Sequence, residues 1–301
     1  MKNKTKQYHI RYKVGKIFYS ILRFFIIFGL GFIILKPIIS KLLLSFMSPS
    51  DILDNTVRLL SKEPSTYYWK KAFEQMYLPH SLVNSILLSL LIAIVQTISC
   101  TLVGYGLARF KFRGRGVAFA FVIIMLLVPY QVISIAQYQG FANIQIGSFQ
   151  IVDSFLPLFV LSFTGLGVRE GLYIYLMREN FKSLDVAIEE AAYVDGAGVF
   201  RTFFFVMLPN ARTMLMTVFL FSYCWQWTDV TSTSLYLNDT KVLANTIGAI
   251  FVKVGVHLDE IGTQYARCAA SLFIALPLFF LFAFCQKYFV KSISQSGLSS
   301  T

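Results

Sequence analysis

Residues 190–209 read EAAYVDGAGVFRTFFFVMLP and lie between two long apolar segments of the chain. An acid and two alanines open the stretch, Gly196 follows after three residues, and Val206 and a Leu-Pro pair close it. This order predicts two short helices separated by a glycine turn. A simple connector between apolar segments needs no such pattern, so we interpret the stretch as an ordered element that contacts another surface.

The expected ends of these two helices follow from local chemistry. Ser183 is predicted to cap a helix that begins at Leu184, because its hydroxyl can accept a backbone N–H. Gly196 is expected to end that helix in the left-handed conformation. The second helix is predicted over residues 199–208 and should stop before Pro209.

Two kinds of surface could contact the first helix. Ala187 and Ala191 share one face, and such small side chains allow close approach. An amphipathic helix on the inner membrane surface is the alternative, and it accounts well for Phe200 and the aromatic run at 203–205. Acids are repelled by an anionic leaflet, however. We therefore favour docking into a protein socket with a basic rim.

The composition is that of a polytopic membrane protein. The chain has 301 residues, is 56% hydrophobic with a mean hydropathy of +0.64, and is only 14% charged. A spanning helix needs roughly 20 apolar residues, and the unalternating runs favour helices over a barrel. We predict an all-α helical bundle with spans at residues 17–44, 81–107, 117–138, 152–176, 213–231 and 266–289.

The net charge of +12 is unevenly distributed. Seven lysines and arginines and no acid lie within the first 23 residues, and four more arginines and lysines lie within 109–115. Residues 138–151 contain neither lysine nor arginine. This alternation follows the positive-inside rule and predicts that both termini are cytoplasmic in the cell membrane. No aromatic-interleaved basic groove suggests nucleic-acid binding.

The predicted organisation is a single membrane domain. Residues 1–16 form a basic cytoplasmic segment, 17–289 the six-span domain with a cytoplasmic loop at 178–212, and 290–301 a cytoplasmic tail. The first apolar run is long and lacks a small-residue cleavage site, so we interpret it as a retained span. Residues 48–80 form the longest external loop, either a cap touched by a partner or an interfacial aromatic belt.

The sequence shows no catalytic constellation. A phosphate-binding loop and the common hydrolase and metalloprotease motifs are absent, and the four cysteines have neither disulfide nor metal spacing. We therefore expect a non-enzymatic chain without a metal or cofactor of its own, which would take any chemical energy from a partner.

Polar residues within predicted spans mark possible substrate pathways. Arg169 and Glu170 stand out because both charges fall well inside the predicted fourth span. The alternative, which we prefer for this pair, is that they pair with each other or with neighbouring helices. The candidate pathway residues are Asn84, Gln96, Gln131, Arg169, Glu170, Trp227 and Asp229.

Several motifs together resemble the permease subunits of ABC importers, in particular the smaller permease of the maltose type within the carbohydrate-uptake class. The EAA stretch has the spacing of their EAA loop. NSILLSLLIA from residue 84, GYGLARFKFRGR from 104, VPYQV from 128 and WTDV from 227 are similar to further family segments. The resemblance extends over about 37–298.

The resemblance implies a set of partners. These are a second homologous permease, two ATP-binding subunits that hold ATP and Mg, an extracytoplasmic solute-binding protein, the lipid bilayer and a sugar substrate. Closure of the ATPase pair would move the docked EAA helix. This movement would switch the cavity from facing inward to facing outward. The residues implied in coupling are Glu189, Glu190, Ala191, Ala192, Asp195, Gly196, Leu208 and Pro209.

The sequence also departs from the family pattern. Thr228 replaces the usual asparagine, and the tail has Ser292 where glycine is common. A permease for another polar solute, or a non-catalytic membrane scaffold or channel, remains the alternative.

Overall fold

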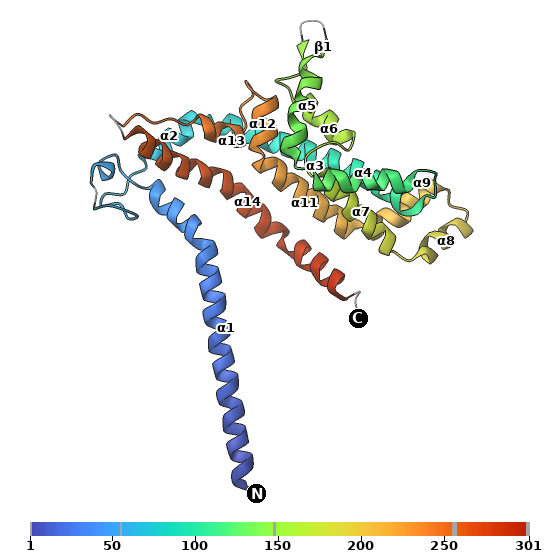
Figure 1. Cartoon of the computed structure of the whole chain (residues 1–301), viewed down its shortest axis with the longest axis horizontal. Coiled ribbons are helices and arrows are strands. Elements are labelled where there is room, and N and C mark those ends of the chain that lie inside the picture. Colours follow the sequence, from blue (N-terminus) through green and yellow to red (C-terminus); the bar gives the residue numbers. More distant parts are fainter. Residues whose placement is uncertain (1, 55, 147–148, 255–257, 299–301) are drawn as a thin grey trace. The chain divides into compact units, whose positions relative to one another are not determined.

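The computed structural model describes residues 2–298 except 55, 147–148 and 255–257. The chain divides into two compact units. Unit 1 comprises Met1–Ala72 and Phe251–Leu272, and unit 2 comprises Phe73–Ile250 and Phe273–Thr301. Helices dominate both units, as predicted (Figure 1).

Unit 1 contains one membrane-length helix and a small folded loop. Its elements are α1 (Lys2–Ser45), a 3-10 turn (Asp51–Leu53), most of α2 (Tyr67–Gln75) and the start of α14 (Asp259–Leu298). Tyr68 is buried there, with its ring 5.6 Å from that of Tyr265. The apolar window of α1 is entirely unburied within the chain, as suits a helix surrounded by lipid.

Unit 2 contains the remaining helices. They are α3 (Leu78–Arg109), α4 (Arg115–Leu127), α5 (Tyr130–Ala142), α6 (Leu156–Phe163), α7 (Glu170–Ser183), α8 (Val186–Val194), α9 (Val199–Thr202), a π-helix (Phe203–Met207), α10 (Leu208–Asn210), α11 (Arg212–Thr228), α12 (Val230–Tyr236), α13 (Leu243–Thr246) and a 3-10 turn (Ile247–Ala249). Two short antiparallel strands, β1 (Gln145–Ile146) and β2 (Phe149–Gln150), follow α5.

Helix α3 forms the centre of unit 2, packed against α7 and α11. At Gly104 the backbones of α3 and α7 approach closely. A Cβ on that glycine would lie 2.7 Å from Met177 Cβ and 3.0 Å from the backbone nitrogen of Arg178. Larger residues at this position would push the two helices apart, so glycine here sets their spacing.

The six predicted spans are only partly reproduced. Three helical segments are long and apolar enough to cross a membrane by themselves: Tyr19–Ser45, Leu78–Arg109 and Asp259–Gln286. Two bent helix pairs raise the number to five among the described residues. In the predicted third span, α4 and α5 meet at 106°, where Pro129 ends the first helix.

The predicted fourth span is not a continuous helix. Helix α6 ends at Phe163 and α7 begins at Glu170. In the connecting loop, Gly165 and Arg169 adopt φ values of +80° and +65°. Interrupted backbone at membrane depth is tolerated where it is buried or lines a cavity. Mean hydropathy does not register such a local break, so the sequence predicted the span without the interruption.

The ends of the chain add two details. From Lys2 onward, the basic segment predicted at 1–16 is part of α1, and α14 continues to Leu298. The predicted tail at 290–301 is therefore helical over most of its length, and its last three residues lie outside the described residues.

Candidate functional site

Helix α8 contains the EAA residues, and its ends differ partly from the prediction. Asp185, rather than Ser183, caps the helix: its Oδ1 accepts from the backbone nitrogen of Ala187 at 3.0 Å. The Ser183 hydroxyl instead donates to the Asn180 carbonyl at the end of α7. Gly196 adopts φ +80° just after the helix, so the glycine stop is confirmed.

The two adjacent acids of α8 lie on different sides of the helix. Glu189 is buried at 6% exposure, whereas Glu190 is exposed. Ala187 lies three residues before Glu190 and Val194 four residues after it, Ala191 follows Glu190 directly, and all three are exposed as well. These four residues form one continuous face of the helix, which we call the α8 outer face. It combines one carboxylate with small and apolar side chains.

Glu189 is held by a group that we call the Glu189 cluster, formed with Tyr105, Arg109 and Tyr193. Glu189 Oε1 accepts from the hydroxyls of Tyr105 at 2.7 Å and Tyr193 at 3.1 Å. Glu189 Oε2 lies 3.3 Å from Arg109 Nε, an ion pair rather than an aligned hydrogen bond. Arg109 Nη2 also donates to the Leu184 carbonyl at 2.7 Å.

The Arg109–Glu189 ion pair of this cluster is buried, so the loss of either partner has a high cost in free energy. Both side chains of the Arg109–Glu189 pair are less than 10% exposed. Removing one partner from a buried pair costs about 3–5 kcal/mol, because the other charge is left without compensation. Burial, followed by the hydrogen bond with Glu189, raises the pKa of Tyr193, which therefore remains a neutral donor.

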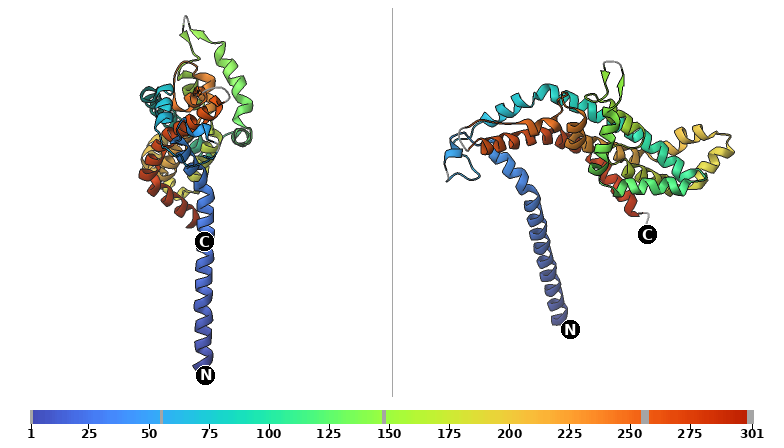
Figure 2. Two further views of the ribbon diagram at one scale, coloured as in Figure 1. Left: turned by 90° about the vertical axis from the view of Figure 1, so that its left-hand side faces the viewer. Right: turned by 45° about the horizontal axis from the view of Figure 1, so that its top comes forward.

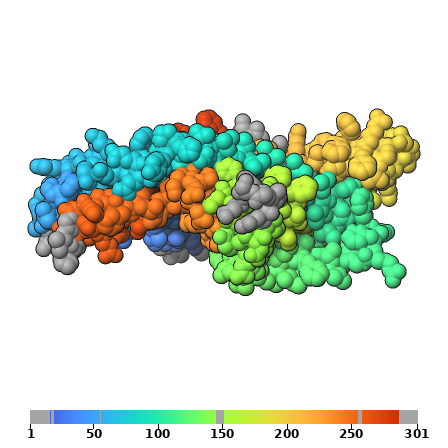
Figure 3. All heavy atoms as spheres, turned by 90° about the horizontal axis from the view of Figure 1, so that it is seen from above, coloured from blue at the N-terminus to red at the C-terminus, as the bar shows by residue number. Residues whose placement is uncertain are grey.

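The aromatic stretch after Gly196 divides between core and surface. It continues through α9, the π-helix and α10 to Asn210, past the stop predicted at Pro209. Phe203 is buried, with its ring 4.8 Å from that of Tyr105, whereas Phe200 and Phe205 are 81% and 76% exposed. Leu208 packs on the adjacent core. Figure 3 shows this segment, in yellow, at the surface of one end of unit 2.

The remaining predicted coupling residues lie along the same segment. Ala192 is half-buried on the inner side of α8, and Asp195 and Pro209 are exposed. Asp195 follows the last residue of α8, and its backbone nitrogen bonds to the Ala191 carbonyl at 3.0 Å.

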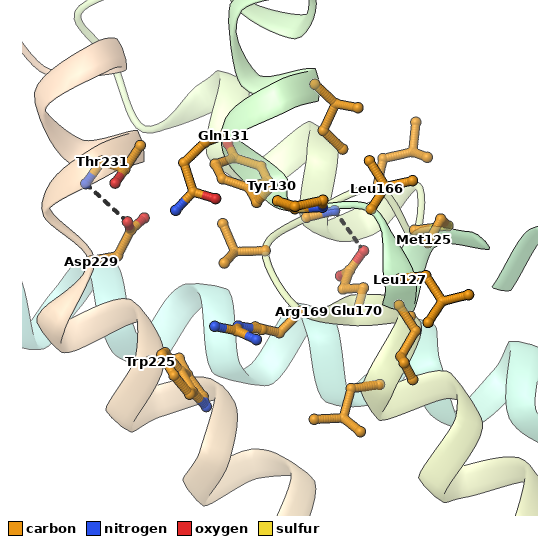
Figure 4. A pocket seen from close by; sticks show the side chains of 18 of the residues that line it. Met125, Leu127, Tyr130, Gln131, Leu166, Arg169, Glu170, Trp225, Asp229 and Thr231 are labelled. Atoms are coloured by element: carbon orange, nitrogen blue, oxygen red, sulfur yellow. Dashed lines mark hydrogen bonds between the residues drawn. The ribbon is translucent and has the colours of Figure 1, made fainter. Parts of the chain in front are cut away.

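A cavity of about 680 Å³ lies farther along unit 2 (Figure 4). The α4–α5 bend, the α6–α7 loop and the junction of α11 and α12 supply its walls. Four of the predicted pathway residues line it: Gln131, Arg169, Glu170 and Asp229. Helix breaks therefore bring together polar groups that are distant in sequence, an arrangement typical of transporter binding sites.

Arg169 and Glu170 do not form the predicted pair. The Arg169 guanidinium lies 4.3 Å from the centre of the Trp225 ring, and the side chain is exposed toward the cavity. Glu170 is fully buried, and its Oε2 accepts from the backbone nitrogen of Gly167 at 2.8 Å. Glu170 Oε1 has no hydrogen-bond partner among the described residues.

Asp229 supports the backbone at the opposite wall. Its Oδ1 accepts from the backbone nitrogens of Thr231 at 3.1 Å and Ser232 at 3.2 Å, capping α12. Figure 4 shows Asp229 and Gln131 on one side of the cavity, with Arg169 between them and Glu170.

Three other candidates do not line this cavity. Asn84 donates to the Lys241 carbonyl at 2.9 Å near the start of α3. Trp227 is buried, and its indole nitrogen donates to the Ile274 carbonyl at 3.0 Å. Gln96 is buried beneath the cavity wall, where it bonds to Ser222 and to the Val168 carbonyl.

Residues 100–295 match the profile of the family described as the binding-protein-dependent transport system inner membrane component. The chain belongs to this family. It is thus a multi-pass membrane subunit of a binding-protein-dependent transport system.

Individual relatives of this transport component are similar over most of their length. The arabinooligosaccharides transport system permease protein AraQ of Halalkalibacterium halodurans is 24% identical over 275 residues, covering 89% of this chain and 92% of AraQ. The maltodextrin transport system permease protein MalD of Streptococcus pneumoniae is 25% identical over 280 residues, covering 92% and 94%.

A solved structure shares the fold of the transport component. It is a chain of a bacterial ABC transporter involved in the import of the acidic polysaccharide alginate. The match has a TM-score of 0.69 at 18% identity and covers 90% of this chain and 96% of that chain. At this identity the likeness supports the fold alone.

Sequence reasoning missed three important residues of the transport component. Arg109 was counted only as one of the basic residues that set topology, and Tyr105 was not singled out. Trp225, which was not flagged from the sequence, lines the cavity and lies under the Arg169 guanidinium, whereas the candidate pathway residue Trp227 does not line the cavity. The two glycines at 165 and 167, so close to a charged pair inside an apolar run, were the signal for the broken helix.

Proposed function

We propose that this chain is the membrane-spanning permease subunit of an ATP-driven importer for an oligosaccharide or another sugar. Its partners are a second homologous permease, two ATP-binding subunits that hold ATP and Mg, and an extracytoplasmic solute-binding protein. The names of the relatives AraQ and MalD support a sugar as substrate. Both chain termini are cytoplasmic in this proposal.

The α8 outer face is the observation that carries the proposal. It presents Glu190 beside Ala187 and Ala191 on a short helix whose opposite side is fixed by Glu189. A soluble ATPase subunit with a basic rim could seat this face. ATP hydrolysis would then take place entirely on that partner, and this chain would act through movement alone.

The cavity supplies the second element of an importer. Gln131, Arg169 and Thr231 offer hydrogen-bond donors, and Asp229 an acceptor, beside the exposed ring of Trp225. Aromatic faces and planar polar groups suit sugar rings and hydroxyls. In the proposed cycle this cavity opens alternately to each side of the membrane.

The test is to reconstitute the complex from this chain and the proteins encoded by its neighbouring genes. The full complex in proteoliposomes, with the binding protein outside and ATP inside, should accumulate labelled arabino- or malto-oligosaccharides. Vesicles with ADP serve as the control. Uptake of only a non-sugar solute would support the alternative substrate class. Uptake that needs neither ATP nor the binding protein would contradict the importer.

A further inference from the structure

Helix α3 connects the α8 segment to the wall of the cavity. Its last turn contributes Tyr105 and Arg109 to the Glu189 cluster. Thirteen residues earlier in the same uninterrupted helix, Gln96 contacts the α6–α7 loop. At 1.5 Å per residue the two contacts are about 20 Å apart. Figures 1 and 2 show α8 at the end of unit 2 where α3 ends.

The cavity end of this connection consists of two hydrogen bonds to the broken helix. Gln96 Nε2 donates to the Val168 carbonyl at 3.3 Å, and Ser99 Oγ donates to the Phe163 carbonyl at 3.0 Å. Val168 immediately precedes Arg169, so α3 holds the loop that carries the cavity arginine. Gln96 also accepts from the Ser222 hydroxyl of α11.

The segment between the two ends has little freedom to slide. At Gly104, α3 and α7 are close enough that an added Cβ would overlap Met177. The Arg109 guanidinium then fixes the end of α7 as well, through the Leu184 carbonyl. Close packing of this kind transmits displacement rather than absorbing it.

We propose that Glu189 is a positioning residue that fastens α8 to α3, so that displacement of α8 reaches the cavity wall through α3. Glu189 therefore faces inward and does not contact the ATPase, whereas Glu190 does. This inference rests on the proposed function, because it takes the α8 outer face as the ATPase contact. The inference adds a physical connection through which the nucleotide state of the ATPase subunits would affect the cavity.

The first test separates docking from transmission. Glu189→Gln keeps the side-chain shape but removes the charge that pairs with Arg109, and Arg109→Met removes the opposite partner. In the reconstituted complex, each variant should retain the ATPase subunits and their basal ATP hydrolysis. Solute imported per ATP hydrolysed should fall by about tenfold. Arg113→Met, which alters an exposed charge nearby, should leave this ratio unchanged.

The double variant Glu189→Gln with Arg109→Met provides an internal check. If both residues act through one contact, the double variant should lose no more transport than the more severe single variant. Additive losses would overturn the proposal. So would an unchanged ratio of import to hydrolysis in both single variants, or uptake that falls only in proportion to lost ATPase subunits.

A distance measurement tests the connection itself, even if a variant assembles poorly. Spin labels are attached at Val186→Cys on α8 and Lys111→Cys just beyond α3. With Glu189 unchanged, the distance between the two labels should have one narrow distribution, with and without ATP. Glu189→Gln should broaden it. A broad distance distribution with Glu189 unchanged would show that α8 and α3 are not rigidly connected, and would overturn the proposal. A wild-type complex without ATP-driven uptake would instead refute the proposed function.

Discussion

The Arg169 guanidinium carbon lies 4.3 Å from the centre of the Trp225 ring, within a cavity and without an ion pair to the adjacent Glu170. A cation over an indole face gains about 0.5–2 kcal/mol, according to its exposure. The charge is thus oriented by α11, while it remains available to a solute.

Replacing Arg169 should impair uptake without preventing assembly. Glu170 takes its hydrogen bond from the Gly167 backbone, so Arg169→Ala does not remove the partner of a buried acid. We expect normal yield of the complex and normal ATPase association, with uptake reduced by tenfold or more, roughly 1.4 kcal/mol. Complex yield and proteoliposome uptake are measured together. A parallel loss of both would favour the structural alternative.

Glu190 should govern attachment of the ATPase. A charge-assisted contact contributes about 1.5–3 kcal/mol, so Glu190→Ala should weaken association by one to two orders of magnitude. Glu190→Lys should weaken it further, because it adds repulsion from a basic rim. Co-purification of the ATPase subunits at equal membrane levels of the permease measures the effect. Wild-type association of both variants would leave α8 as a membrane-surface helix.

Gly196 should act through the backbone. With φ at +80° and no atom within 4 Å of an added Cβ, any penalty is conformational rather than steric crowding. Gly196→Val should cost about 1–2 kcal/mol and misplace α8, whereas Gly196→Asn should be tolerated, since asparagine adopts this conformation readily. ATPase association separates the two variants. Equal association would show that the turn does not position the helix.

The predicted topology can be tested with single cysteines in a background lacking Cys100, Cys224, Cys268 and Cys285. Thr66→Cys should react with an impermeant maleimide in intact cells. Ser183→Cys should react only after permeabilisation, because it precedes the predicted cytoplasmic α8. Labelling of Ser183→Cys in intact cells would contradict both the orientation and the docking of α8.

The sequence by itself determined the features that depend on local chemistry. The apolar runs predicted a helical membrane protein, because hydrocarbon leaves the backbone few alternatives. Gly196 marked the end of α8, because positive φ is an intrinsic property of glycine. Most of the polar residues flagged within predicted spans also proved to line or support the cavity wall.

The tertiary structure decided what depends on distant neighbours. Glu189 and Glu190 are adjacent acids in the sequence. The contacts of Glu189 with Tyr105 and Arg109 near the end of α3 decide which of the two is buried. Likewise, Trp225 rather than Trp227 meets Arg169, because the α6–α7 break carries the arginine to that side of α11. Such contacts join residues far apart in the chain, where periodicity and local propensity carry no information.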